Sequence, residues 1–306
     1  MVAVTGATGF IGSSLCLRLL AQGFQVRALV RNPDRASELA ARGAALIQGD
    51  LQSPAALQQL VTDSDAIVHG AGVVRGSSQA AFDQVNVAGT AAVLNAIESQ
   101  TRPPRLLLLS SLAAREPELS WYARSKRGGE KLLQQSTGLD WVIVRPPAVY
   151  GPGDKEMLPV FQAMARGIAT VPGSADARMS LIHVSDLVEA ILACLQHGDT
   201  KHQTLSLCDG KQNGYSWYEL AAIAGDTWAR RVRIWRVPTW LLNTLAGLNL
   251  KLARISGGAP MLTPAKLREL RHSDWVVDNN AITRTTGWTP SVSLREGLEM
   301  LKNPAI

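Results

Sequence analysis

A tyrosine and a lysine stand four residues apart near the middle of the chain, shortly after a pair of serines. Ser110 and Ser111 end an apolar stretch, and Tyr122 and Lys126 lie in a segment with a helical pattern. Residues i and i+4 share one face of a helix, so the ammonium group would lower the pKa of the phenol. The serine hydroxyl could hold a substrate oxygen against that phenol. The set predicts proton exchange with a carbinol oxygen by Tyr122, coupled to hydride transfer at a nicotinamide ring.

A glycine-rich turn at the start of the chain could bind the nucleotide that such a reaction needs. Residues 5–12, Thr-Gly-Ala-Thr-Gly-Phe-Ile-Gly, follow an apolar strand at 2–5 and open a helix at 11–22. The first two glycines allow a tight turn beside a pyrophosphate, the third lets the helix pack on the strand, and the helix N-terminus attracts the phosphates. The predicted cofactor contacts here are Gly6, Thr8, Gly9, Phe10, Ile11 and Gly12.

The residues that follow the next strands predict how the rest of the nucleotide is bound. Arg31 follows a strand at 25–30, where a carboxylate would favour NAD, and its guanidinium suits the 2′-phosphate of NADP. We therefore expect NADP in preference to NAD, with a solvated strand-end arginine as the alternative. Asp50 could accept the adenine amino group and Leu51 could lie against the ring. Ala71 lies in a small-residue turn beside the cofactor, whereas His69 is expected to be a packed strand-end residue.

The elements that position these groups alternate regularly in the first half of the chain. Apolar strands are predicted at 2–5, 25–30, 44–48, 66–69, 106–109 and 141–144, with helices at 11–22, 33–42, 55–61, 82–99 and 121–135. This alternation predicts an α/β fold with a doubly wound parallel Rossmann sheet. We expect a dinucleotide-binding domain over 1–150. Residues 151–306 should form mainly a smaller C-terminal substrate lobe, with some elements, such as 181–184 and the helix after it, returning to the main sheet.

Taken together, the motifs resemble the short-chain dehydrogenase/reductase superfamily. More narrowly, they are similar to its extended branch of NAD(P)-dependent epimerases, dehydratases and 3β-hydroxysteroid dehydrogenase-like proteins. The resemblance covers nearly the whole chain. It rests on residues 5–12, 50–51, 86–90, 110–111, 122–126, 145–154, 182–186 and 287–298.

The resemblance implies a role for each matching residue. Tyr122 would be the general acid and base, Lys126 would hold the nicotinamide ribose and tune Tyr122, and Ser111 would orient the substrate oxygen. Pro146 and Val149 would border the nicotinamide. It also implies that Asn86 braces a helix or supports a proton relay, and that His183 and Asp186 are structural. Tyr122 follows Ser111 by only 11 residues, which trims one wall of the pocket and disfavours a nucleotide-sugar substrate.

Composition limits the other classes of function. The 306 residues are 46% hydrophobic and 18% charged, which excludes a disordered chain. The net charge of +6 suits an anionic ligand, but we expect no nucleic-acid partner. Three distant cysteines predict neither a disulfide framework nor a metal site and fit a cytoplasmic protein. No secretory signal or spanning apolar run is visible. A homodimer through two sheet-flanking helices is a further expectation from similar proteins.

The second half of the chain bears on the substrate. Arg178 could meet an anionic group or form a surface ion pair, and Trp217, Trp228, Trp235 and Trp240 suggest apolar surface or, more often, core. An amphipathic helix is predicted over 237–255. Its apolar stripe should pack on the lobe or cover a hydrophobic pocket, and contact with a membrane surface is the less favoured alternative. The stripe consists of Val237, Leu241, Leu245, Leu248, Leu252 and Ile255.

These observations favour an NADP-preferring oxidoreductase that interconverts a carbonyl and an alcohol, on a small substrate that could be steroid-like or otherwise apolar. One alternative is a nucleotide-sugar epimerase or dehydratase with tightly held NAD(P). The other is a protein that binds NADP as a sensor or scaffold without chemistry, although such a protein would be expected to lose the tyrosine or the lysine.

Overall fold

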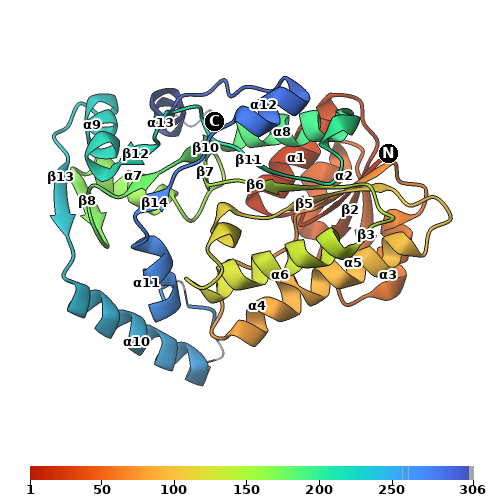
Figure 1. Cartoon of the computed structure of the whole chain (residues 1–306), viewed down its shortest axis with the longest axis horizontal. Coiled ribbons are helices and arrows are strands. Elements are labelled where there is room, and N and C mark those ends of the chain that lie inside the picture. The colour runs from red at the N-terminus through yellow and green to blue at the C-terminus, as the bar shows by residue number, and fades with distance from the viewer. Residues whose placement is uncertain (257, 261, 303–306) are drawn as a thin grey trace.

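A seven-stranded parallel sheet forms the centre of the molecule in the computed structural model, which describes residues 1–256, 258–260 and 262–302 (Figure 1). The strand order is β11-β6-β5-β4-β1-β2-β3. The strands are β1 (Val2–Thr5), β2 (Val26–Val30), β3 (Ala45–Gln48), β4 (Ala66–His69), β5 (Arg105–Leu109), β6 (Trp141–Arg145) and β11 (Gln203–Ser206). The order reverses direction between β1 and β4, as in the predicted doubly wound Rossmann sheet, where ligands bind at the carboxyl ends of the strands.

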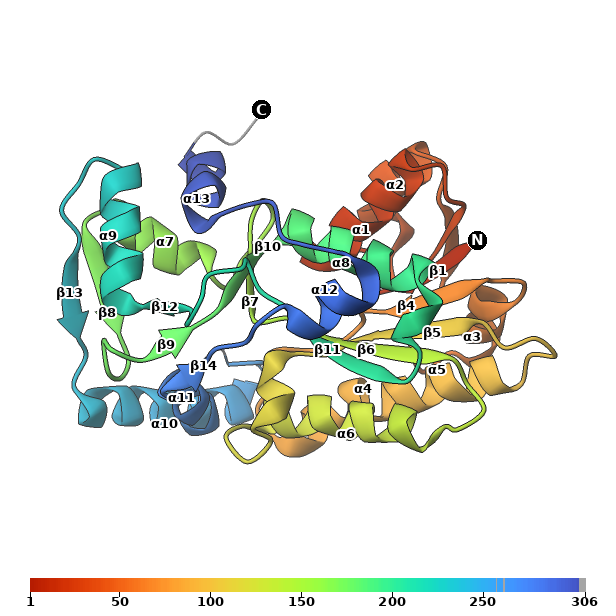
Figure 2. The ribbon, with the colours of Figure 1, turned by 45° about the horizontal axis from the view of Figure 1, so that its top comes forward.

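Helices cover both faces of this sheet, which explains why its strands are apolar at almost every position. One face carries α1 (Phe10–Ala21) and α8 (Val184–Gln196), and the other carries α3 (Pro54–Val61), α5 (Ala88–Glu98) and α6 (Trp121–Gln135) (Figure 2). Neighbouring residues of β5 enter opposite cores. Leu107 and Leu109 pack with α1 and α8, whereas Leu106 and Leu108 pack with α3, α5 and α6.

Three local predictions need correction. The segment 33–42 is not one helix but a 3₁₀ turn (Pro33–Ala36) followed by α2 (Ser37–Ala41), and 82–99 is divided into α4 (Gln79–Asn86) and α5. The strand predicted at 181–184 is β10 (Leu181–His183), which pairs with β7 (Ala148–Tyr150) outside the main sheet. The following helix, α8, does pack on the main sheet. The segment that returns to that sheet as a strand is β11, which pairs with β6.

A smaller lobe lies beyond the carboxyl edge of the sheet (Figure 2). A third core, which includes Tyr150, Phe161, Trp217 and Leu298, holds it together. The lobe consists of α7 (Leu158–Ala165), β8 (Ile168–Val171), β9 (Arg178–Met179), β12 (Tyr215–Ser216), α9 (Trp217–Thr227), β13 (Arg233–Arg236), α10 (Thr239–Ser256), α11 (Pro264–Leu270), β14 (Asp274–Trp275) and α13 (Leu294–Lys302), and α12 (Asn280–Thr286) returns to the main sheet between them.

The C-terminal part of the chain is tied to the fold through a buried carboxylate. Asp186 accepts hydrogen bonds from the amides of Ser291 and Val292 at 3.0 and 2.9 Å, and from the Ser291 hydroxyl at 2.7 Å. His183 caps the N-terminus of α8, with its Nδ1 2.7 Å from the Ser185 hydroxyl. Both residues therefore have the structural roles that the resemblance implied.

The helix predicted over 237–255 is α10, but only the first part of its apolar stripe, Val237 and Leu241, is half-buried, and the rest does not pack on the lobe. Leu245, Leu248, Leu252 and Ile255 are exposed, and the buried residues of this helix include Ala246 and Ala253 on its opposite side. No helix within the described residues is long and apolar enough to cross a membrane. Cys16, Cys194 and Cys208 are free and buried.

Two glycines provide a test of this packing. A Cβ at Gly297 of α13 would lie 2.4 Å from the hydroxyl of the buried Tyr150, whereas a Cβ at Gly247 of α10 would meet no atom within 4 Å. We expect Gly297→Ala to lower the free energy of unfolding by about 1–3 kcal/mol through overpacking. Gly247→Ala should raise it by about 0.5–1 kcal/mol, because alanine favours a helix interior. Denaturant unfolding measures both, and equal effects of the two substitutions would contradict the packing described.

Candidate active site

The glycine-rich turn forms a cradle at the carboxyl end of β1 that side chains would fill. Gly6 has φ +77°, its carbonyl accepts from the Gly9 amide at 2.9 Å, and a Cβ at Gly12 would lie 2.1 Å from that carbonyl oxygen. Gly9 precedes α1 without a side-chain cap, so the amides at the start of α1 are not covered by one. Thr8 and Gly9 are exposed, and Phe10 and Ile11 are half-buried. The cradle fits a dinucleotide pyrophosphate.

The end of β4 closes against this turn. A Cβ at Gly6 would lie 2.7 Å from the Ala71 nitrogen, so the backbone of Ala71 is in close contact with the glycine turn. The Thr5 hydroxyl accepts from that Ala71 amide at 3.1 Å and lies 2.7 Å from His69 Nδ1. His69 Nε2 is 3.2 Å from the Thr90 hydroxyl, and burial lowers the pKa of His69 to about 3. His69 is thus a neutral, packed residue, as predicted.

At the adenosine end of the predicted cofactor site, one predicted residue is exposed and two others make contacts within the protein. Arg31 is exposed directly after β2. The Asp50 carboxylate accepts from the Gln52 amide and the Ser53 hydroxyl, both at 2.9 Å, and so holds the turn before α3. Leu51 packs on α5, because a Cβ at Gly89 would lie 2.5 Å from its Cδ1.

The serine, tyrosine and lysine converge at the carboxyl end of β5. Ser111 lowers the pKa of the Tyr122 phenol, its hydroxyl accepts from the Ala113 amide at 3.2 Å, and Lys126 Nζ donates to the Leu109 carbonyl at 2.7 Å. Tyr122 and Lys126 both lie on α6 and are half-buried. The structure thus places the three residues at one end of β5, and their catalytic roles remain a prediction.

The expected lowering of the Tyr122 pKa is wrong for this structure. The pKa of Tyr122 is raised to about 12, mainly by burial and in smaller part by the carboxylates of Glu269 and Glu156, and the hydrogen bond from Ser111 opposes this rise only in part. Lys126 itself is desolvated, and burial lowers its pKa to about 8 although the nearby Glu130 charge works in the opposite direction. At neutral pH the tyrosine is a phenol and the lysine still carries its proton.

A fully buried carboxylate that sequence reasoning missed holds α6 in place. Glu130 accepts from the Ser110 hydroxyl at 2.6 Å, from Arg145 Nε at 2.7 Å and from Arg127 at 3.0 Å. These contacts connect α6 to the ends of β5 and β6. The signal in the sequence is its position four residues after Lys126, which places both on one side of the helix.

Asn86 braces the loop beside the lysine. Its side chain donates to the Val73 carbonyl at 3.1 Å and to the Ser125 hydroxyl at 2.9 Å, and accepts from the Val73 amide at 2.8 Å. A Cβ at Gly72 would lie 3.0 Å from Asn86 Oδ1 and 3.7 Å from Lys126 Nζ. Of the two roles that the resemblance implied, the contacts match the brace.

A small pocket adjoins Tyr122. Its lining is mainly apolar, and includes Val74, Phe82, Trp121, Pro260 and Ala265. The Phe82 and Tyr122 rings meet edge to face with centroids 6.3 Å apart. Two cations, Lys266 and Arg75, also line the pocket. They were not predicted from the sequence, because no local motif marks them.

Both of these cations have carboxylate partners. Lys266 lies 5.5 Å over the Tyr122 ring and pairs with Glu269, which also accepts from the Ser120 hydroxyl at 2.5 Å. Arg75 pairs with Glu156 at 2.7 Å, joining the loop after β4 to the loop after β7.

The loops after β6 and β7 form the other side of the site. The Pro146 carbonyl accepts from the Leu112 amide at 2.8 Å, next to Ser111. Val149 lies in β7, opposite Ile182 of β10. A Cβ at Gly153 would lie 3.5 Å from the Phe10 ring, so this loop reaches the glycine-rich turn. Pro146 and Val149 therefore lie on the segment between the predicted catalytic and phosphate sites.

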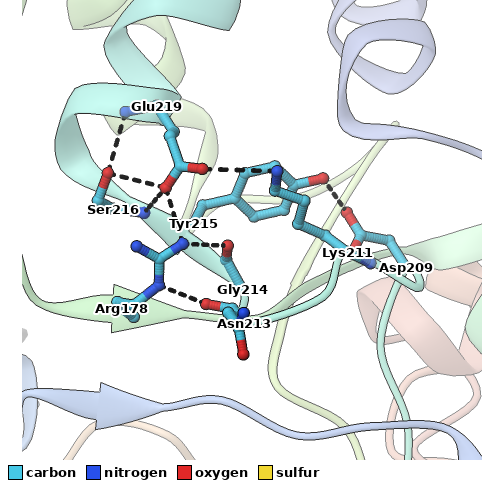
Figure 3. A network of polar contacts seen from close by, with 8 residues as sticks. All are labelled: Arg178, Asp209, Lys211, Asn213, Gly214, Tyr215, Ser216 and Glu219. Carbon is cyan, nitrogen blue, oxygen red and sulfur yellow. Dashed lines mark hydrogen bonds and ion pairs between the residues drawn. The ribbon is translucent and has the colours of Figure 1, made fainter.

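Arg178, one candidate for binding an anionic substrate, forms the alternative ion pair instead (Figure 3). Its guanidinium contacts Glu219 at 3.0 Å and the carbonyls of Asn213 and Gly214 at 2.5 and 3.1 Å. Glu219 also closes a capping box with Ser216 at the start of α9. Arg178 therefore holds the lobe together.

Comparison with known proteins agrees with this architecture. Residues 2–207 match the model of the NAD dependent epimerase/dehydratase family. A ceramide reductase of Caulobacter vibrioides is 34% identical, with 90% of this chain and 85% of that protein aligned. A 2-alkyl-3-oxoalkanoate reductase of Shewanella oneidensis is 27% identical, covering 98% and 84%. A UDP-glucose 4-epimerase of Vibrio cholerae is 26% identical, covering 97% and 93%.

Among solved structures, a UDP-glucuronic acid 4-epimerase from Bacillus cereus in complex with NAD and a fluorinated UDP-glucuronic acid superposes with a TM-score of 0.76 over 97% of this chain and 96% of that one. Its identity of 19% supports the fold alone. With the match to the family model, the chain belongs to the NAD dependent epimerase/dehydratase family, and is an enzyme of the NAD(P)-dependent oxidoreductase type.

Proposed function

We propose that the protein is an NADPH-dependent reductase that converts a carbonyl on a hydrophobic substrate to an alcohol. The observation that carries this proposal is the placement of Ser111, Tyr122 and Lys126 at the carboxyl end of β5, next to a mainly apolar pocket. Two relatives, named as reductases of ceramide and of 2-alkyl-3-oxoalkanoates, support a substrate with alkyl chains.

The proposed chemistry divides between the cofactor and three side chains. When bound, the nicotinamide supplies a hydride to the carbonyl carbon. Tyr122 donates its proton to the carbonyl oxygen, so that C=O gains one hydride and one proton, and Ser111 donates a hydrogen bond to the same oxygen. Lys126 stabilises the phenolate that remains and holds the ribose. A pKa of about 12 keeps Tyr122 in the acid form that reduction requires.

The cofactor assignment follows the geometry of the turn and the end of β2. In the proposed site, residues 1–150 bind the nucleotide and much of 151–306 binds substrate. Arg31, exposed at the end of β2, would meet the 2′-phosphate of NADP. The proposed contacts are Gly6, Thr8, Gly9, Phe10, Ile11, Gly12, Arg31, Asp50, Leu51, Ala71, Tyr122, Lys126, Pro146 and Val149.

The charges around the pocket argue against a nucleotide-sugar substrate. Lys266 and Arg75 pair with Glu269 and Glu156, and Arg178 pairs with Glu219. A sugar diphosphate that bound Lys266, Arg75 or Arg178 would have to compete with these carboxylates for the cation. The buried thiols fit a reducing compartment, and we propose the cytoplasm.

Replacement of Tyr122 by phenylalanine tests the proposed acid. We expect Tyr122→Phe to lower the rate of NADPH oxidation with long-chain ketones or 3-oxoalkanoates by roughly 10²–10⁴-fold, since it removes the proton donor. NADPH affinity, measured by fluorescence titration, should change little. Tyr218→Phe, at an exposed tyrosine of α9, is the matched control. An active Tyr122→Phe enzyme, or tight UDP-sugar binding without any ketone reduction by the wild-type protein, would contradict the proposal.

The pH profile tests the lysine. The kcat/KM of reduction should be level below about pH 8 and fall above it, because Lys126, with a pKa of about 8, loses its proton there. Glu130→Gln removes a charge that raises the pKa of Lys126, so the falling limb should move to lower pH. Glu299→Gln, at an exposed site of α13, should leave the limb in place. A limb unmoved in folded Glu130→Gln protein would refute this coupling.

Arg31 is tested by cofactor selectivity. Arg31→Gln should weaken NADPH binding roughly tenfold or more, because a charge-assisted hydrogen bond to the 2′-phosphate is lost, and should leave NADH binding nearly unchanged. Arg284→Gln, at an exposed arginine of α12, serves as the control. Equal losses for both cofactors would show that Arg31 does not read the 2′-phosphate.

A further inference from the structure

The outer face of α10, defined by Leu245, Leu248, Leu252 and Ile255, is apolar and exposed to solvent. The exposed fractions of these four residues are 47%, 53%, 65% and 85%. They recur at steps of three and four, so they form one continuous stripe along the helix. Figure 1 places α10 at the edge of the molecule, beyond α11. A stripe of large aliphatic side chains in this position marks an interaction surface.

Contacts on the opposite side of α10 fix the orientation of the helix. Ala246 and Ala253, on the opposite side of the helix, are buried, and Asn249 donates to the Leu262 carbonyl at 3.1 Å. Arg271, just after α11, donates to the Asn243 side chain at 3.1 Å. The outer face is therefore not the side that α10 uses to pack on the lobe.

Two tryptophans extend this apolar surface. Trp240, at the start of α10, is 70% exposed, and Trp235, in β13, is 65% exposed. Trp235 lies opposite Thr170 of β8. The pair formed by Arg233 and the exposed Ile168 is two residues away along these strands. Tryptophan beside exposed aliphatic residues is typical of proteins that bind at the boundary between water and lipid.

The same segment carries a concentrated positive charge. Residues 227–268 contain eight lysines and arginines and neither Asp nor Glu, so the rest of the chain, which has a net charge of +6, sums to −2. Arg230, Arg231 and Arg233 are exposed, and Arg236 donates to the Tyr218 hydroxyl at 3.0 Å. Exposed basic residues in the segment that leads into an apolar helix face complement an anionic lipid surface.

We propose that β13 and the outer face of α10 form a docking surface for an anionic lipid bilayer. The leucines and tryptophans insert at the level of the headgroups, and the arginines meet the lipid phosphates. A second copy of the chain fits this face poorly, because a two-fold contact would bring the exposed Arg230, Arg231 and Arg233 of two copies together. A nucleic acid would use the arginines and leave the aliphatic stripe exposed to water.

The pocket beside Tyr122 is lined in part by the segment that follows this surface in the chain. Pro260, Thr263, Ala265 and Lys266 line the pocket beside Tyr122 and belong to the segment that directly follows α10. The docking proposal does not depend on the reaction, since binding to vesicles is measured without substrate.

Vesicle flotation tests the surface. The wild-type protein should bind vesicles of phosphatidylcholine with phosphatidylglycerol, bind pure phosphatidylcholine much less, and be weakened by high salt. Leu248→Glu combined with Leu252→Glu should weaken binding at least about tenfold, because two inserted leucines are lost. The combined changes Arg230→Gln, Arg231→Gln and Arg233→Gln should abolish the preference for anionic vesicles. Met300→Glu, at a 46% exposed residue of α13, and Arg284→Gln are the matched controls.

Several outcomes would overturn the proposal. The first is failure of the wild-type protein to float with anionic vesicles. The second is a leucine variant that floats as well as the wild-type protein. A wild-type dimer that the leucine variant converts to monomer in sedimentation would assign the face to a second copy. Strong binding of a mixed-sequence oligonucleotide that depends on the arginines and not on the leucines would assign it to nucleic acid. Circular dichroism and NADPH binding confirm that each variant is folded, and the single Leu252→Glu change, at a 65% exposed site, replaces the double variant if that one misfolds.

Discussion

The buried carboxylate of Glu130 is the constraint on which the position of the site depends. A charge removed from water is tolerated only where partners compensate it, and here Arg145, Arg127 and the Ser110 hydroxyl do so. These partners come from the ends of β5 and β6 and from α6 itself. Because the carboxylate satisfies all of them at once, rotation of α6 would leave at least one buried charge unpaired. Tyr122 and Lys126 take their positions from this helix.

The same charge affects the chemistry of its neighbour. Lys126 is desolvated between α6 and the end of β5, which lowers its pKa, and Glu130 opposes that effect. As a result, the lysine is protonated at neutral pH, but its pKa of about 8 is only slightly above that pH. Tyr122, in contrast, is buried and lies near two carboxylates. Both the burial and the carboxylates favour the neutral phenol. A protonated phenol beside a protonated amine is a suitable resting state for the carbonyl reduction that we propose.

Local patterns predicted those parts of the molecule that local chemistry determines. The glycines of residues 5–12 require a turn that few other residues allow, and the i and i+4 spacing of Tyr122 and Lys126 places them together on any helix. Contacts between distant segments could not be predicted in this way. Glu130 meets Arg145 only because β6 lies beside β5. The seventh strand, β11, is short and half polar, and only its pairing with β6 identifies it.

The pKa of Tyr122 and the orientation of α10 were missed for a common reason. The sequence shows that a lysine is near the phenol, but the burial and the carboxylates that outweigh it come from other elements. Likewise, the 3–4 spacing of leucines shows that α10 has an apolar face without showing what covers it. Alanines contribute little to a pattern of hydrophobic residues, but here they lie on the side of α10 that packs on the lobe. A helix that packs through alanine can place its leucines outside, and the basic residues around them are then the feature that distinguishes a lipid surface from a missing core.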